Sequence, residues 1–238
     1  MPARLSELKR RLHKAYNETM RWITALLILL TAAPACAEDA SAPAIAPISL
    51  AELAANADVV AVAQIKDTDY LLRREIPVSG SAYLKILIPY KMDQAADMVE
   101  VYEKGLRDQE CYFPNPTVFE EGRRYLLFLA RDVEYPERLR GLPEGCALEV
   151  LVDSDNGYAL RYPVTGINLS DPLAGLAQPM TFSDGYAVVD DEDLQPARRD
   201  AMLDAGQIRQ YQPGQWIYTT GIGLARVREL MGPDALFD

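Results

Sequence analysis

Histidine is almost absent from this sequence of 238 residues, since the only one is His13. Serine and cysteine hydrolases need a base beside the nucleophile, and that base is nearly always a histidine. The sequence also has no G-x-S-x-G turn, which carries the nucleophile in α/β-hydrolases. Because His13 lies in a leader that we expect to be removed, the usual nucleophile and base pairs are excluded.

Long apolar runs are scarce as well. The longest, Ile23 to Ala33, is about half of the ~20 residues that a membrane-spanning helix needs, and Pro34 follows it. Basic residues precede this run, and it ends in Ala35-Cys36-Ala37, with small residues at the two positions that signal peptidase reads. The pattern predicts a signal peptide over residues 1–37, cleaved after Ala37, and therefore a periplasmic or secreted protein.

Two alternatives concern this leader. Lipidation at Cys36 is less favoured, because Ala33 and Pro34 stand where lipoprotein signals carry leucine or a similar residue. We also hypothesise that translation begins at Met20, since Met20-Arg21-Trp22 would make a compact start. The mature chain is the same for either start.

Basic residues are outnumbered. Removing residues 1–37 takes away 6 of 24 basic and 2 of 35 acidic residues, which leaves 18 against 33 and a net charge of −15. Such a chain repels nucleic acid and anionic membrane surfaces, whose binding depends on lysine and arginine. We therefore expect that the mature chain has no nucleic-acid partner and is not an integral membrane protein. A basic protein partner fits this charge.

Cysteine is rare too, and only Cys111 and Cys146 remain in the mature chain. In an oxidising compartment two thiols predict one disulfide. Closing a loop of about 35 residues stabilises a fold by about 3.5 to 4 kcal/mol in the chain-entropy model. With no histidine to activate a thiolate, we interpret this bridge as structural.

The first part of the mature chain predicts a spacer followed by a helix. Residues 38–47 are rich in alanine and proline without apolar periodicity, which is typical of a disordered segment. Ser49 and Glu52 then have the spacing of a capping box. We expect a short helix from there to about Asn56.

Short β-rich runs dominate the next hundred residues, at 58–67, 82–91, 98–105, 125–130, 147–153 and 158–164. The first and fourth are apolar on both faces, as buried strands are. Asn156-Gly157 between the last two runs predicts a tight hairpin. Strands at this spacing favour a mainly β, α+β fold with a small OB-like antiparallel barrel over residues 48–165.

The remaining residues, 166–238, predict an extension packed on the barrel. It contains a hairpin or an irregular strand pair around Asp184-Gly185 within residues 181–191 and a helix from Asp193 to Gly206, with Pro196 in its first turn. A short strand in GQWIYTTG and a final helix, which begins near Leu224, follow.

Motifs for phosphates and metals are incomplete. The glycines of TGIG lack the third glycine of a dinucleotide loop and the Gly-Lys-Ser/Thr of a P-loop, so no cofactor is expected. Residues 153–156 lack the spacing of an EF-hand loop. The acidic run Asp190, Asp191, Glu192 and Asp193 stands before a helix, where the helix dipole favours negative charge, and calcium there is a weak hypothesis.

The segment from Ser49 to about Ala130 resembles secreted bacterial proteins of the netrin-like or tissue-inhibitor-of-metalloproteinase-like kind. The similarity lies in SLAELAANA, in Asp58-Val59-Val60, and in Cys111 before the pattern FEEGRRYLLFL that ends at Leu129. This resemblance implies an OB-type barrel. The inhibitors of that family place a cysteine at the mature N-terminus to meet a zinc ion, whereas this mature chain should start at Glu38.

These observations predict a non-catalytic binding or inhibitory module of the cell envelope. Tyr112, Phe113 and Tyr135 are the candidates for an exposed aromatic patch that binds a partner. One alternative is a hydrolase of envelope glycan, which would need two carboxyl groups ~5 to 9.5 Å apart. The other alternative is a purely structural envelope protein.

Overall fold

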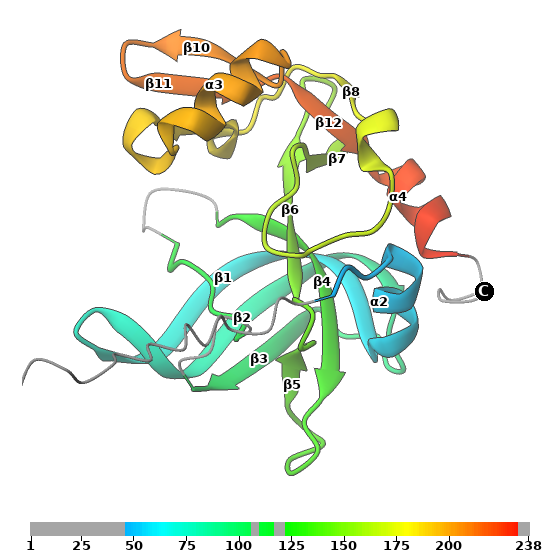
Figure 1. Ribbon diagram of the computed structural model, residues 1–238. Coiled ribbons are helices and arrows are strands. Elements are labelled where there is room, and N and C mark those ends of the chain that lie inside the picture. The colour runs from blue at the N-terminus through cyan, green and yellow to red at the C-terminus, as the bar shows by residue number, and fades with distance from the viewer. Residues whose placement is uncertain (1–45, 106–109, 117–121, 233–238) are drawn as a thin grey trace, which may run out of the picture. The chain divides into compact units, whose positions relative to one another are not determined.

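The computed structural model of the protein describes residues 46–105, 110–116 and 122–232 (Figure 1). The predicted signal peptide, with Met20 and Cys36, lies outside the described residues, as does the predicted spacer up to residue 45. None of the helices in these described ranges combines the length and the apolar composition that a membrane crossing requires.

The first described helix, α2 (Leu50–Asn56), begins as its sequence predicts. The backbone N–H of Glu52 donates to Ser49 Oγ (3.2 Å), and the backbone N–H of Ser49 donates to Glu52 Oε2 (2.9 Å). This reciprocal capping box satisfies donors that a helix start leaves without partners. Leu50, Leu53 and Ala54 on its other face are buried.

Five strands close a small barrel, which confirms the predicted mainly β, OB-like fold. The order around the barrel is β1-β2-β3-β5-β4, and β4 pairs with β1 to close it. Only the contact between β3 and β5 is parallel. The strands are β1 (Val59–Arg73), β2 (Ile76–Lys91), β3 (Met98–Lys104), β4 (Arg124–Arg131) and β5 (Leu139–Gly141).

Strand β1 is apolar on both faces because it separates two cores. Val59, Ala61 and Ala63 belong to the cluster that also contains Leu84, Val101 and Leu127 from the other barrel strands. Val60 and Val62 face a second cluster, which α2 covers with Leu50 and Leu53. Side chains alternate between the faces of a strand, so a strand buried on both sides has no polar face.

The barrel sheet continues beyond β4. Strands β6 (Ala147–Val152) and β7 (Tyr158–Arg161) form the predicted hairpin, in which Asn156 has φ 62°. Strand β12 (Thr220–Gly223) then pairs with β7, and β8 (Gln178–Pro179) pairs with β12. Residues on both sides of the predicted boundary at 165 therefore share one sheet.

The last described helix, α4 (Leu224–Met231), packs on this sheet and on α2 (Figure 1). Its buried residues Leu224, Val227 and Met231 belong to the same cluster as Leu50 and Leu53.

A third cluster lies under a separate three-stranded sheet. That sheet has the order β10 (Ile208–Gln212), β11 (Gln215–Tyr218) and β9 (Val188–Asp190). Helix α3 (Pro196–Asp204) adds Met202 to this cluster, and Gly206 follows it with φ 67°. Short 3-10 turns connect these elements at Leu173–Gly175, Gly185–Ala187 and Asp191–Asp193.

The hairpin expected around Asp184-Gly185 is wrong. Asp184 instead caps the turn Gly185–Ala187, because its side chain accepts a hydrogen bond from the backbone N–H of Tyr186. The strand that follows, β9, pairs with β11 from much later in the chain. The Asp184-Gly185 pair is a turn signal, but here Asp184 caps a 3-10 turn and does not connect two paired strands.

The predicted disulfide is present. Cys111 and Cys146 are bonded, with their Cα atoms 6.0 Å apart and a sequence separation of 35 residues. Cys111 is buried in the barrel cluster, and Cys146 packs at its edge. A Cβ atom on Gly141 would lie 2.7 Å from Cys146 Cβ, so the bridge fits against β5 only where a glycine stands.

Candidate functional site

The hairpin of β1 and β2 extends well past the barrel. The two strands stay paired from Val60 and Lys91 to Arg73 and Ile76, while β1 pairs with β4 only from Val59 to Gln64. Beyond Asp67 most of β1 is exposed. The outer half of the hairpin therefore projects from the barrel, as Figure 1 shows on the left-hand side.

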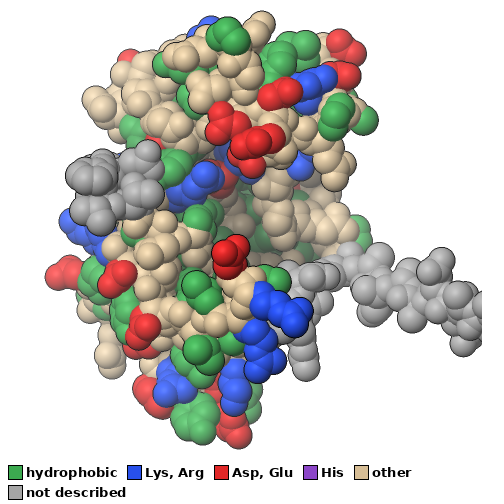
Figure 2. Space-filling view, turned by 90° about the vertical axis from the view of Figure 1, so that its left-hand side faces the viewer, with side chains coloured by type: hydrophobic (Ala, Val, Ile, Leu, Met, Phe, Trp, Pro, Cys, Tyr) green, Lys and Arg blue, Asp and Glu red, His purple; other side chains and the backbone are tan. Residues whose placement is uncertain are grey.

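The tip of this hairpin combines exposed apolar and basic side chains. We define the tip as residues 71–76. Leu71, Leu72 and Ile76 are 65%, 58% and 57% exposed, although these residue types are usually buried. Arg73 and Arg74 are exposed beside them, and neither forms an ion pair with any described residue. Figure 2 views the molecule from this side, and hydrophobic side chains lie among charged ones over its lower part.

The turn at the tip is strained. Arg73 pairs with Ile76, so the connection consists of Arg74 and Glu75, whose φ angles are 52° and 67°. Two-residue turns with both φ angles positive favour Asn-Gly, because other residues pay a steric penalty there. Such outliers persist only where the surrounding structure imposes them, and they occur often at functional sites.

The base of the projecting half is braced by the disulfide segment. The backbone N–H of Phe113 donates to the hydroxyl oxygen of Tyr70 (3.1 Å). The rings of Tyr70 and Tyr112 meet edge to face, with centroids 5.2 Å apart. Burial raises the pKa of Tyr70 to about 12, although the bond from Phe113 opposes this. Strand β3 pairs with β2 only as far as Ser79, so the hairpin is two-stranded beyond that point, and these contacts brace its base.

A second set of bonds completes the brace. The hydroxyl of Tyr112 donates to the carbonyl oxygen of Gly105 (3.1 Å), and the backbone N–H of Gly105 donates to the carbonyl oxygen of Val78 (3.0 Å). Strand β2, the end of β3 and the disulfide segment are thereby joined.

The structure gives the three candidate aromatic residues different places. Phe113 is buried, with its ring 5.2 Å from that of Tyr125, so the expectation of exposure fails for this residue. Tyr112 is half-buried in the brace. Tyr135 is exposed on the loop between β4 and β5, where the Arg138 guanidinium lies over its ring at 4.8 Å. The three residues form no common exposed patch.

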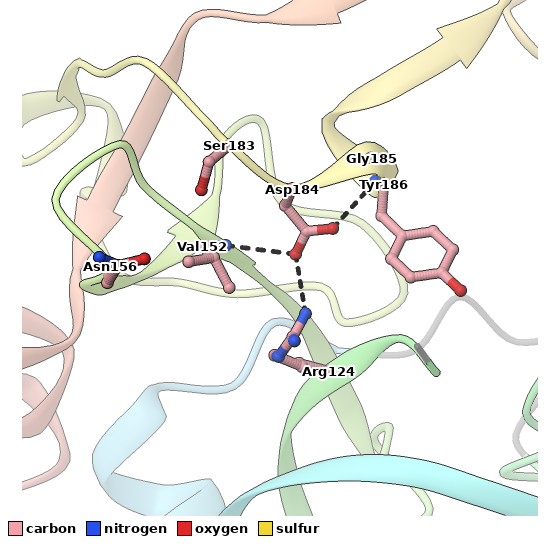
Figure 3. A pocket seen from close by; sticks show the side chains of 7 residues that line it. All are labelled: Arg124, Val152, Asn156, Ser183, Asp184, Gly185 and Tyr186. Atoms are coloured by element: carbon pink, nitrogen blue, oxygen red, sulfur yellow. Dashed lines mark hydrogen bonds and ion pairs between the residues drawn. The ribbon is translucent and has the colours of Figure 1, made fainter. Parts of the chain in front are cut away.

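A polar cavity of about 510 Å³ lies between β4, β6 and the turn at Asp184 (Figure 3). The carboxylate of Asp184 is 4% exposed and accepts bonds from Arg124 (3.1 Å) and from the backbone N–H groups of Val152 (3.3 Å) and Tyr186 (3.0 Å). Asn156 and Ser183 also line the cavity and lie to the left of Asp184 in Figure 3, whereas Tyr186 lies to its right. Asp184 thus joins the barrel to the later part of the chain.

The chemistry of this cavity favours a structural role. Ser183 Oγ donates to the carbonyl oxygen of Asp153 (2.8 Å), which leaves it turned toward the backbone. The neighbouring arginines are also engaged: Arg123 and Arg161 both pair with Glu149. The carboxylate next to Ser183 in the lining is Asp184, and it is held by its bonds to Arg124, Val152 and Tyr186.

A glycoside hydrolase would need a pair of neighbouring carboxyl groups, and two described carboxylates share one arginine. Glu103 and Asp132 both bind the guanidinium of Arg140, through Nη2 (3.2 Å) and Nη1 (3.3 Å). Burial raises the pKa of Glu103, whereas hydrogen bonds from the backbone N–H groups of Tyr135 and Glu134 lower the pKa of Asp132. Opposite shifts of this kind can separate an acid from a base.

The contacts of Glu103 nevertheless indicate a structural role. The residue is 2% exposed, its Oε1 accepts from the backbone N–H of Gly141 (2.8 Å), and its Oε2 binds Arg140. A general acid must reach the bond that it protonates. Glu103 instead fixes β5 against β3 beside the disulfide.

The acidic run does not gather into a metal site. Asp191 Oδ1 accepts from Arg199 (2.9 Å) and from the indole N–H of Trp216 (2.8 Å), while Asp190 accepts from Gln215 (3.0 Å). In the part of the chain that the structure describes, no group of three or more histidine, cysteine or acidic residues could hold a metal ion. These carboxylates connect the turn to α3 and β11.

Comparison with known proteins adds no assignment: no family model, no curated protein and no solved structure matches the chain. Geometry alone therefore identifies the candidate site. Leu71, Leu72 and Ile76 were not predictable from the sequence, because only the projection of the hairpin distinguishes them from core residues.

Proposed function

We propose that this protein is an exported, non-catalytic binding module that contacts a protein partner through the tip of its β1–β2 hairpin. The observation that supports this proposal is the exposure of Leu71, Leu72 and Ile76 on a braced projection. Exposed apolar groups in one place are typical of interaction surfaces. A few residues contribute most of the affinity of many interfaces, and arginines such as Arg73 and Arg74 are common among them.

The brace supports a binding role for the tip. Binding costs less when the contacting element is already ordered, because fewer conformations are lost on association. The bond between Tyr70 and Phe113 and the neighbouring disulfide order the base of the hairpin in the free protein.

Export belongs to the same proposal. A disulfide such as Cys111–Cys146 persists in oxidising compartments and is rare in the cytosol. The strained turn at the tip fits a contact role, because strain of this kind is retained where function requires it.

The test is capture of the partner from envelope extract with the mature chain, residues 38–238, as bait. The tip variant Leu71→Ser/Leu72→Ser/Ile76→Ser should lose the partner, since it removes the apolar anchors without touching the core. The matched control is Val133→Ser, because Val133 is fully exposed on another loop. Retention of the same partner by the tip variant would overturn the proposal.

A further inference from the structure

The far end of the same hairpin carries an apolar groove. It has a volume of about 660 Å³ and lies where β2 leads into the loop before β3. Ile86, Leu87, Pro89 and Met92 supply its apolar lining, and Asp93 and Asp97 stand among them. The loop is fixed to the strand, because the backbone N–H of Ile86 donates to the carbonyl oxygen of Asp97 (2.9 Å).

The groove and the tip are complementary in chemistry. The tip presents Leu71, Leu72 and Ile76 with two arginines and one acid, Glu75, and the groove presents apolar side chains with two exposed aspartates. The groove volume lies within the range of about 300 to 1,000 Å³ that binding pockets usually have. Opposite charges around an apolar contact set its orientation and exclude partners of the wrong sign.

The charged groups are available for this contact. Arg73, Arg74 and Asp97 form no ion pair with a described residue. Asp93 pairs with Arg131 at 3.4 Å, but both side chains are largely exposed. An exposed pair of this kind contributes little, so Asp93 can exchange Arg131 for another arginine at small cost.

The tip cannot occupy the groove of its own chain. Strand β2 connects them, with Ile76 of the tip at its start and Ile86 of the groove ten residues later. A strand rises about 3.3 Å per residue, which separates the two along the strand by roughly 30 Å. A contact between tip and groove must therefore join two molecules.

We infer that the partner of the tip is a second copy of this chain, whose groove receives Leu71, Leu72 and Ile76 while Arg73 and Arg74 pair with Asp93 and Asp97. This inference rests on the proposed function, because it takes the tip as the contact surface. The contact is head-to-tail, since the two surfaces differ. Such contacts close into rings or propagate as chains.

Sedimentation velocity of the mature chain over a range of concentrations tests this inference. The mean mass should rise with concentration, with a dissociation constant on the order of 10 to 100 μM for a contact of this small size. The tip reversal Arg73→Glu/Arg74→Glu and the groove reversal Asp93→Arg/Asp97→Arg should each weaken association at least tenfold. Each reversal places like charges across the contact.

Charge exchange gives the decisive comparison. Mixing the two reversed variants should restore association, because each then meets a complementary surface, and one chain with all four substitutions should again associate with itself. The control Arg198→Glu/Arg209→Glu changes two exposed arginines elsewhere by the same charge and should leave association unchanged.

Three results would overturn the inference: a monomer mass at every concentration, association that neither reversal weakens, or reversed variants that stay monomeric when mixed. The envelope capture experiment separates this failure from failure of the proposed function. If the chain is monomeric but the tip variant still loses a different captured protein, the tip is the contact surface and the second copy is not its partner.

Discussion

The backbone N–H of Phe113 donates to the hydroxyl oxygen of Tyr70 across 3.1 Å, and this bond links the disulfide segment to the projecting hairpin. Tyr112 packs its ring edge against the same tyrosine. Tyr112 and Phe113, which the sequence suggested as part of a contact surface, thus brace the base of the hairpin whose tip is the proposed contact surface.

Replacing Tyr70 with phenylalanine should destabilise the protein by about 1 to 3 kcal/mol, because the N–H of Phe113 would lose its acceptor while remaining partly buried. Urea unfolding monitored by circular dichroism measures this change. The exposed Tyr211→Phe serves as the control and should be neutral. An equal and negligible effect of both variants would show that the bond does not brace the hairpin.

The same substitution should change the response to alkaline pH. Burial raises the pKa of Tyr70 to about 12, above its ordinary value of 10.0, so the neutral hydroxyl is favoured in the folded state. The stability that this group contributes is present below pH 10 and is lost as the pH rises toward 12. The stability difference between wild type and Tyr70→Phe should therefore shrink over that interval. A constant difference would contradict this assignment.

Removing the disulfide with Cys111→Ser/Cys146→Ser should cost about 3.5 to 4 kcal/mol in the chain-entropy model for a loop of this length. Capture of the partner should weaken as well, because residues 110–113 would no longer be held against Tyr70. Thermal unfolding with and without a reductant measures the first effect in the wild type. A loss below about 1 kcal/mol would mean that the loop is held by other contacts.

Relieving the backbone strain of the turn at the tip should stabilise the fold. It should also weaken binding to the partner, because the substitution removes Arg74. Arg74→Asn/Glu75→Gly supplies residues that accept positive φ angles, for an expected gain of about 1 kcal/mol. Arg73→Asn is the matched control, because Arg73 lies in the paired strand and should bring no gain. A double variant that is less stable than the wild type would contradict the strain at Arg74 and Glu75.

Breaking the buried ion pair of Figure 3 should be costly. Asp184→Asn removes a charge that pairs with Arg124 in a site where the carboxylate is 4% exposed, and such losses amount to about 3 to 5 kcal/mol. The exposed pair of Arg226 and Glu229 is the comparison, and Glu229→Gln should cost no more than about 0.5 kcal/mol. Chemical denaturation of both variants measures the two losses of stability. Equal losses would mean that the pair of Asp184 and Arg124 contributes no more than an exposed pair.

Local signals in the sequence predicted much of this fold. Ser49 and Glu52 form the capping box that their spacing indicates, and the two-sided apolar pattern of β1 identifies a strand between two cores. Two remaining cysteines were sufficient to predict their pairing. Each of these predictions depends on residues whose chemistry allows few alternatives.

The projecting hairpin was not predictable in the same way. Its turn consists of Arg74 and Glu75, which carry no turn signal, and the β-rich runs expected at 58–67 and 82–91 stop short of the turn that β1 and β2 in fact reach. The bond between Tyr70 and Phe113 joins residues 43 positions apart, and no local pattern contains it. Exposure of Leu71 and Leu72 depends on where the barrel ends, which is a property of the tertiary structure.

Photo-crosslinking in the intact envelope tests the role of the tip most directly. A photoreactive amino acid in place of Leu72 should give a defined adduct, while the same group in place of the fully exposed Val133 should give none. An adduct of twice the chain mass would identify a second copy. Adducts from position 133 without any from position 72 would contradict the claim that the hairpin tip is the contact surface.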